Sequence, residues 1–245
     1  MKALRALWVV ARAIAHAVAG LRTIAFRFPA LDAAQREREV SQWAQRMLDV
    51  LGIALEVHGT PPAHGPMLLV SNHLSWLDIL VMHAARFCRF VSKADVKHWP
   101  LIGRLATGAG TIYIERERRR DAMRVVHHVA EHLSAGDIVA VFPEGTTGDG
   151  SRLLPFHANL IQAAISAGSP VQPVALAFLD AATRRPAAGP RYIGDETLAG
   201  SLWRTVTGPP IVAVVAYGEP QHALGRDRRS WAAALHEAVD DLRKR

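Results

Sequence analysis

The sequence is poor in features that several classes of protein depend on. A single cysteine, Cys88, excludes an internal disulfide framework. Aromatic residues make up only 7% of the 245 residues, which is low for a module that stacks nucleic-acid bases. Half of the residues are nevertheless apolar, too many for a disordered chain, and the length suffices to bury a core without a structural metal. We therefore expect one globular domain, with or without an appendage.

Charge of one sign is also in short supply. The chain has 22 acidic residues against 29 Lys and Arg, a surplus of seven positive charges. Such a surplus favours an anionic partner, which leaves nucleic acid, a phospholipid surface, or a phosphorylated or acidic substrate.

Residues 2–28 lack an uninterrupted apolar run, because Arg5, Arg12 and Arg22 divide them. A simple transmembrane span, which needs about 18 or more apolar residues, is therefore not expected. On a helix, one face collects large apolar side chains and the other collects basic ones. The apolar face would comprise Leu7, Val10, Ile14, Val18 and Leu21, and the basic face Lys2, Arg5, Arg12 and His16. This pattern predicts a helix at a membrane interface, with anionic headgroups on its basic side.

Two other interpretations of this segment stay open. A basic start and Ala-His-Ala at 15–17 suggest a cleaved signal peptide, and an ordinary amphipathic helix packed on the domain has the same periodicity. A second helix should follow from an N-cap at Asp32 to Gly52, with Phe28-Pro29 as the turn. We expect residues 1–55 to form a two-helix, membrane-associated motif and residues 56–245 to form the main domain.

From residue 53 onward, short β-branched runs alternate with longer helical patterns. The predicted strands lie within 53–59, 66–72, 89–93, 110–116, 137–145, 169–179 and 210–220, and the predicted helices near 75–85, 121–135, 157–167 and 228–244. Continuous apolar runs indicate strands covered on both faces, so the domain is α/β. Residues 184–200 are the one long irregular segment, and such segments are usually binding loops or lids.

His73 follows a buried type of strand, and Asp78 lies five residues later. An imidazole oriented by a carboxylate is the minimum needed to take a proton from a hydroxyl. The spacing alone is a weak signal, because it recurs at His132/Asp137, His222/Asp227 and His236/Asp241. Only the copy at 73 has a strand and Asn72 before it, so we interpret the other histidines as satisfied or solvated.

Two further strand ends bear polar groups. A strand ends at Arg116, whose guanidinium would be placed to grip a phosphate or carboxylate. The arginines around 118–124 are interpreted as a solvated basic face. Another apolar strand runs into Pro143-Glu144-Gly145-Thr146, a sharp turn that presents a carboxylate, a hydroxyl and free amides.

Four ordered segments resemble the phospholipid and glycerol acyltransferase family. They are Asn72 to Asp78 (Asn-His-x4-Asp), Gly110 to Arg116, Phe142 to Thr146 (Phe-Pro-Glu-Gly-Thr) and Val171 to Val174, within about 65–180. The resemblance implies a mixed, largely parallel sheet flanked by helices, with the two-helix motif in front. It also implies His73 as general base, Asp78 as its orienting partner, and substrate binding by Asn72, Arg116, Glu144, Gly145, Thr146 and Thr147.

The same resemblance implies acyl transfer without a covalent acyl-enzyme, and the sequence contains no Gly-x-Ser-x-Gly elbow. The acyl donor would be acyl-CoA or acyl-carrier protein, and no other cofactor and no metal would be required. The acceptor would be a lysolipid hydroxyl at an anionic membrane surface, on the cytoplasmic face of the inner membrane. Nucleic acid is not an expected partner.

The acceptor head group is where the chain departs from the family. Members that act on 1-acylglycerol-3-phosphate commonly have a cation after Glu-Gly-Thr and another after the later Pro-Phe, where this chain has Thr147 and His157. A Glu-Gly-Thr-Thr sequence resembles members that acylate lyso-ornithine lipid. We keep 1-acylglycerol-3-phosphate first and lyso-ornithine lipid as the alternative.

Two rival functions come from other classes. His128-x-x-Glu131-His132 matches the arrangement of inverted zinc proteases, although the segment also has the pattern of an ordinary amphipathic helix. A non-enzymatic membrane-binding or nucleic-acid-binding module would explain the charge surplus. It would leave Asn72, His73 and the turn at Glu144 without a role.

Overall fold

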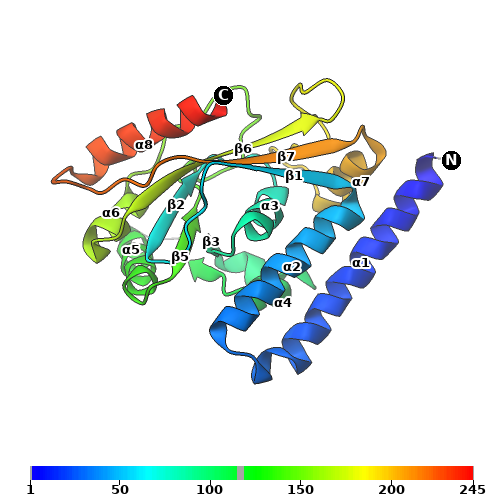
Figure 1. Ribbon diagram of the computed structural model, residues 1–245, viewed down its shortest axis with the longest axis horizontal. Helices are drawn as coiled ribbons and strands as arrows, with labels where there is room; N and C mark the ends of the chain where they lie inside the picture. The colour runs from blue at the N-terminus through cyan, green and yellow to red at the C-terminus, as the bar shows by residue number, and fades with distance from the viewer. Residues whose placement is uncertain (1, 115–118, 245) are drawn as a thin grey trace.

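The computed structural model describes residues 2–114 and 119–244, and of residues 119–122 the backbone only. Its centre is a seven-stranded sheet in the order β1-β7-β6-β2-β5-β3-β4 (Figure 1). The strands are β1 (Ile53–His58), β2 (Met67–Ser71), β3 (Arg89–Lys93), β4 (Ile112–Ile114), β5 (Ile138–Val141), β6 (Val171–Asp180) and β7 (Ile211–Tyr217). Every neighbouring pair is parallel except β6 and β7. The expected mixed, largely parallel sheet is confirmed.

Continuous apolar runs form the strands at the centre of this sheet. Every residue of β2 and β5 is buried, because helices cover both faces there. Asn72 and His73 follow β2 directly, and Pro143 and Glu144 lie two and three residues after the end of β5. Since β2 and β5 are parallel neighbours, both turns emerge at the same edge of the sheet.

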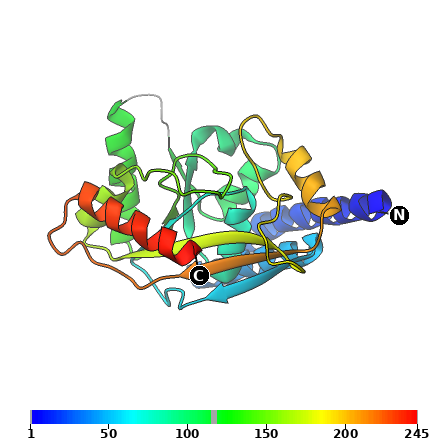
Figure 2. The same cartoon turned by 90° about the horizontal axis from the view of Figure 1, so that it is seen from above.

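Helices form a layer on each face of the sheet (Figures 1 and 2). The α-helices are α1 (Lys2–Phe26), α2 (Ala33–Leu51), α3 (Leu77–Ala85), α4 (Ile102–Gly108), α5 (Arg119–Ser134), α6 (Asn159–Ala167), α7 (Leu198–Thr207) and α8 (Arg228–Arg243). Short 3-10 helices are η1 (Phe28–Ala30) and η2 (Ala94–His98). Apolar side chains of α1, α2 and α3 share one core with the sheet, and those of α5, α6 and α8 share the other.

The two predicted N-terminal helices are present and lie side by side (Figure 1). The carboxylate of Asp32 accepts from the Gln35 amide, and the Gln35 side chain accepts from the Asp32 amide, which closes a capping box at the start of α2. Gly52 ends α2 with a φ of 73°, a conformation that favours glycine.

Small residues form the seam by which α1 packs against the rest of the molecule. Ala6, Ala13, Ala17 and Gly20 are its buried residues. His16 and Trp43 fasten the seam, because each ring nitrogen is within hydrogen-bond distance of the other residue's carbonyl oxygen, at 3.0 and 3.1 Å. Most large apolar side chains of α1 lie outside this seam, although Val9 and Ile24 pack against the core. Those exposed are Leu4, Leu7, Trp8, Ile14, Val18 and Phe26.

The exposed face of α1 bears on the membrane question. By length and composition α1 could cross a membrane, since an 18-residue window has a mean hydropathy of 1.4 with only 22% of it buried. The expectation against a span rested on the arginines, and these alone do not decide between lying on a bilayer and crossing it. Packing through a seam of small residues also differs from the ordinary amphipathic alternative, in which the large apolar face would be buried.

Candidate active site

His73 and Asp78 meet where β2 ends and α3 begins. The Nδ1 atom of His73 lies 2.6 Å from Oδ2 of Asp78, whose side chain is fully buried. The backbone amides of Leu74 and Ser75 donate to the same oxygen at 2.7 and 2.9 Å. The carboxylate therefore fixes both the ring and the loop that carries it. Because Nδ1 donates to Asp78, Nε2 is the basic nitrogen of the neutral imidazole.

An aromatic wall supports the His73 ring from one side. The ring stacks on Phe142 with a centroid distance of 4.0 Å and an interplanar angle of 8°. Phe142 in turn stacks on Phe90 of β3, 5.8 Å away. The His73 side chain keeps 22% of its surface exposed, so the imidazole is held rigidly while part of it stays accessible to a substrate.

Asn72 is buried and bound to backbone. Its side-chain amide donates to the Leu176 carbonyl at 3.0 Å, and its side-chain oxygen accepts from the Leu176 amide at 2.8 Å. This reciprocal pair joins the end of β2 to the middle of β6. The contacts of Asn72 thus hold the strand end that presents His73, and a role in binding substrate, expected from the resemblance, stays a prediction.

Glu144 also binds backbone in this structure. One of its carboxylate oxygens accepts from the His73 amide at 2.7 Å and the other from the Leu154 amide at 2.8 Å. Burial raises the pKa of Glu144, and the hydrogen bonds from Leu154 and His73 oppose that shift. The carboxylate therefore ties the loop after β5 to the loop after β2. Binding of the acceptor head group by Glu144 remains a prediction.

The residues that follow Glu144 surround His73 as well. Gly145 has a φ of 73°, and a Cβ there would lie 3.2 Å from the His157 ring. The Gly148 amide donates to the His73 carbonyl at 2.8 Å. Thr146 is exposed, whereas Thr147 donates its hydroxyl to the Tyr192 carbonyl. The structure thus joins Glu144 and Gly148, which flank the predicted residues 145–147, to the backbone of His73. Arg116 lies outside the described residues.

Two residues in this region were missed by the sequence argument. Arg243, from the last turn of α8, donates to the Gly150 carbonyl at 2.6 Å and pairs with Asp240 at 3.1 Å. Its charge also lowers the pKa of Glu144, against the larger effect of burial. Ser75 donates to the Pro190 carbonyl at 2.5 Å. No local motif marks either residue, because both act through contacts between distant segments.

The competing zinc motif is engaged in ion pairs along α5. His127 and His128 both contact Glu131, at 3.2 and 3.1 Å, while His132 contacts Asp137 at 2.7 Å. Within residues 2–114 and 119–244, no group of three His, Cys, Asp or Glu side chains is arranged to hold a metal ion. Side chains of this motif thus form ion pairs within α5 and join the end of α5 to the residue before β5.

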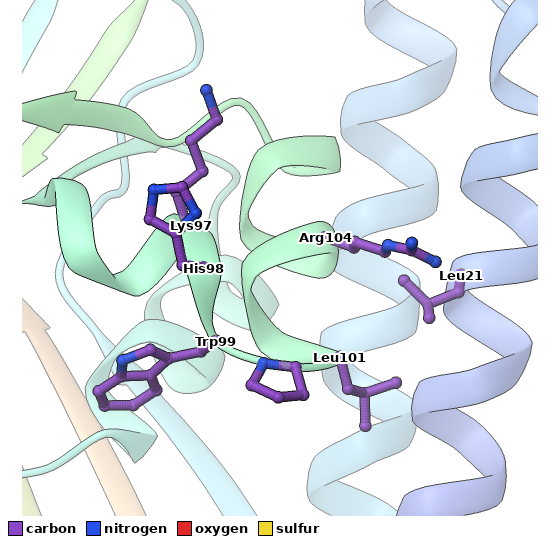
Figure 3. Close-up of a pocket in the computed structure, with 7 residues that line it drawn as sticks. Leu21, Lys97, His98, Trp99, Leu101 and Arg104 are labelled. Carbon is purple, nitrogen blue, oxygen red and sulfur yellow. The ribbon is translucent and has the colours of Figure 1, made fainter.

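A groove of about 410 Å³ lies beside α1, away from the dyad (Figure 3). It is lined by Leu21, Lys97, His98, Trp99, Pro100, Leu101 and Arg104. Arg104 of α4 extends toward Leu21 of α1. Leu101 has a φ of 65°, and Ile102 donates to the Pro100 carbonyl at 2.7 Å, so a strained γ-turn starts α4. Three basic side chains thus line this groove, and one of them, Arg104, extends to α1.

A partly exposed imidazole oriented by a buried carboxylate, at the carboxyl end of a parallel strand, has the geometry that general-base activation of a hydroxyl requires. The acyltransferase family model matches residues 54–177, and the chain belongs to this family. It is an acyltransferase enzyme, as its resemblance in sequence implied.

Two curated relatives are similar over most of the chain. One is a 1-acyl-sn-glycerol-3-phosphate acyltransferase of Neisseria meningitidis serogroup B, 41% identical over 70% of this chain and 67% of that protein. The other is a lyso-ornithine lipid O-acyltransferase of Pseudomonas aeruginosa, 37% identical over 87% of this chain and 81% of that protein. The crystal structure of the 1-acyl-sn-glycerophosphate acyltransferase from Thermotoga maritima shares the fold, with a TM-score of 0.73 at 19% identity, covering 100% of this chain and 97% of that one.

Proposed function

We propose that the protein transfers a fatty acyl group from an acyl thioester to the free hydroxyl of a lysolipid. The donor is acyl-CoA or acyl-carrier protein. The observation that carries the proposal is the His73–Asp78 pair, in which Nδ1 is bound at 2.6 Å and Nε2 is therefore the basic nitrogen. Both substrates bring the reacting groups with them, so the proposed reaction uses no metal and no further cofactor.

The reaction then follows from the pair. Nε2 of His73 takes the proton of the acceptor hydroxyl while the oxygen attacks the thioester carbonyl, and the buried Asp78 stabilises the imidazolium. The new C–O bond forms, the C–S bond breaks, and the imidazolium returns the proton to the departing thiolate. Neither Asn72 nor Glu144 takes part in proton transfer in this scheme, because both are engaged with backbone groups.

Two head groups are candidates for the acceptor. The first is 1-acylglycerol-3-phosphate, the substrate named for the Neisseria relative. The second is lyso-ornithine lipid, the substrate named for the Pseudomonas relative, whose similarity extends over a larger share of the chain. Thr147 favours the second, because its hydroxyl is bound to a carbonyl where members that bind a phosphate commonly have a cation.

We also propose that α1 brings the enzyme to an anionic membrane at the cytoplasmic face of the inner membrane. The exposed apolar side chains of α1 and the basic groove beside it support this proposal. A membrane location would supply the lysolipid acceptor directly, since that substrate resides in the bilayer.

The test offers the purified protein an acyl-CoA and an acyl-carrier protein thioester, each with 1-acylglycerol-3-phosphate or with lyso-ornithine lipid. We expect a doubly acylated product from at least one combination and loss of that product in His73→Ala. The matched control is His222→Ala, since His222 is an exposed histidine of another predicted His-x4-Asp copy. No product in any combination would overturn the acceptor class, and full activity of His73→Ala would overturn the mechanism.

A further inference from the structure

The segment between β6 and α7, residues 181–197, touches both loops of the active site. We name this segment the β6–α7 loop. Ser75, in the loop that carries His73, donates to the Pro190 carbonyl at 2.5 Å. Thr147, in the loop after Glu144, donates to the Tyr192 carbonyl. Two carbonyls only two residues apart are therefore bound to the two segments between which the dyad lies.

Residues of α7 bind two other carbonyls of the β6–α7 loop. Ser201 donates to the Arg191 carbonyl at 3.2 Å, and Arg204 donates to the carbonyls of Gly189 and Arg191 at 3.2 and 2.5 Å. The indole of Trp76, at the start of α3, donates to the Ser201 hydroxyl at 3.1 Å. Four successive carbonyls, from 189 to 192, thus receive side-chain hydrogen bonds. Carbonyl groups of a solvent-exposed loop can be satisfied by water, so these side-chain hydrogen bonds hold the loop in a defined conformation.

Thr147 is the link between this loop and the residues expected to meet the acceptor. It lies three residues after Glu144, and its side chain is half-buried. Its hydroxyl hydrogen is donated to Tyr192, so the group holds the β6–α7 loop in place. Because its hydroxyl is donated to Tyr192, Thr147 positions the β6–α7 loop and does not offer that hydrogen to a head group.

We propose that the β6–α7 loop is a clamp over the acceptor side of the His73–Asp78 dyad, and that Thr147 is the positioning residue that fastens it. The proposal rests on the proposed acyl transfer and adds the element that fixes affinity for the acceptor. A fastened clamp lowers the entropy lost when the lysolipid head is bound, without touching the reacting atoms. It therefore acts on the KM for the acceptor and leaves the KM for the thioester unchanged.

Three variants separate this role from a general effect on folding. Thr147→Val removes the hydroxyl at nearly constant volume, and Thr147→Ser restores it. Thr207→Val is the matched control, because the Thr207 hydroxyl bonds within α7, to the Trp203 carbonyl at 2.7 Å. Losing one hydrogen bond should raise the acceptor KM of Thr147→Val about fivefold, with Thr147→Ser and Thr207→Val near wild type.

A second readout does not depend on activity. Arg191, which precedes Tyr192, is an exposed trypsin site within the clamp, whereas the Arg185–Pro186 bond resists trypsin. We expect faster cleavage after Arg191 in Thr147→Val than in wild type, Thr147→Ser or Thr207→Val, measured by mass spectrometry of the first fragments under native conditions. Thr147→Ser should protect this cleavage site as well as wild type does.

The outcomes distinguish this proposal from the proposed function. If wild type forms no product, acyl transfer to these lysolipids fails, and the cleavage rates still decide whether Thr147 fastens the loop. If wild type is active and Thr147→Val keeps both its acceptor KM and its resistance to trypsin, the clamp is overturned. An equal rise in the KM for acceptor and thioester would overturn the assignment to the acceptor side.

Discussion

One oxygen of Asp78 organises the start of the active-site loop. It accepts from the His73 ring and from two backbone amides, whereas the other oxygen, Oδ1, has no hydrogen-bond partner among the described residues. An asparagine could accept the same three hydrogen bonds through its single amide oxygen, but it would bring no negative charge to the imidazolium. The residue is therefore needed as an anion and as a scaffold.

Asp78→Asn should lower kcat by about three to four orders of magnitude, because a neutral amide orients the imidazole more weakly and the imidazolium loses its counter-charge. The measurement is initial rate with saturating thioester and lysolipid. Asp241→Asn is the control, since that carboxylate is 70% exposed on α8. Activity of Asp78→Asn within tenfold of wild type would contradict the role of the pair.

His83 is a buried histidine that the reaction does not use. It lies on α3 between Phe87 and Phe90, and its Nδ1 has no partner among the described residues. Burial lowers the pKa of His83 from 6.5 to about 4. The unfolded chain therefore binds a proton below pH 6.5 that the folded chain refuses, so stability is complete above pH 6.5 and falls until about pH 4.

We expect this group to contribute about 2 kcal/mol to the loss of unfolding free energy between pH 7 and pH 5. His83→Leu removes the titrating group, so its loss over that interval should be smaller by the same amount. Urea unfolding at the two pH values measures the difference. The same loss in both proteins would show that His83 does not titrate as its burial implies.

Residues near the dyad differed in how well the sequence predicted them. His73 and Asp78 are close in the chain and follow a strand, so their contact was predictable from the sequence. The partners of Glu144 were not, because a buried carboxylate that binds amides of Leu154 and His73 has the same local sequence as one that faces a ligand. Ser75 and Arg243 contact segments about 90 or more residues away in sequence, and no local pattern records that.

At the scale of elements, the apolar and β-branched runs located the seven strands. Burial on both faces, expected for these runs, holds for the central β2 and β5 but not for β1, which lies at the sheet edge and is mostly exposed or half-buried. The helices α4 and α7 were missed. The helix α4 has only seven residues, two of them glycines, and α7 begins within a stretch rich in Gly, Asp and Thr. Both are stabilised by packing against other elements rather than by helix propensity, so their sequences alone resemble loops.

Gly20 is a position in the α1 seam that leaves no room for a larger side chain. A Cβ there would lie 2.5 Å from Nε1 of Trp43, which is itself bonded to the His16 carbonyl. Gly20→Leu should separate α1 from α2 and lower the unfolding free energy by about 1–3 kcal/mol. Ala19→Leu makes a similar change on the exposed side of α1 and should be nearly neutral. Equal thermal midpoints for the two variants would refute close packing at this seam.

At the scale of the whole molecule, positive charge lies on both sides of the sheet, but among the described residues the row of large exposed apolar side chains lies on α1. The α1 side combines six exposed large side chains with Lys97, His98 and Arg104. The α8 side carries Arg228 and Arg229 without such a row. We therefore expect the basic side chains on the α1 side, and not those on the α8 side, to assist binding to an anionic membrane.

Lys97→Glu with Arg104→Glu should weaken binding to phosphatidylglycerol vesicles by about tenfold or more at low salt, since each cation near an anionic surface is worth about 1 kcal/mol. The difference in vesicle binding between this variant and wild type should become smaller as salt is added. Arg228→Glu with Arg229→Glu changes the net charge equally on the α8 side and should bind nearly as wild type. Vesicle flotation measures all three proteins. Equal weakening by the two pairs would mean that net charge alone governs binding.

The position of β1 at the sheet edge has a consequence for the order in which the chain is made. β1 pairs with β7, so Ile53 lies opposite Ile211. The partner strand β7 is therefore synthesised more than 150 residues after β1. α1 and its exposed apolar face leave the ribosome well before the sheet can close. The proposed attachment of α1 to a bilayer would thus be available before the active site has formed, and it would precede the enzyme's folding rather than follow it.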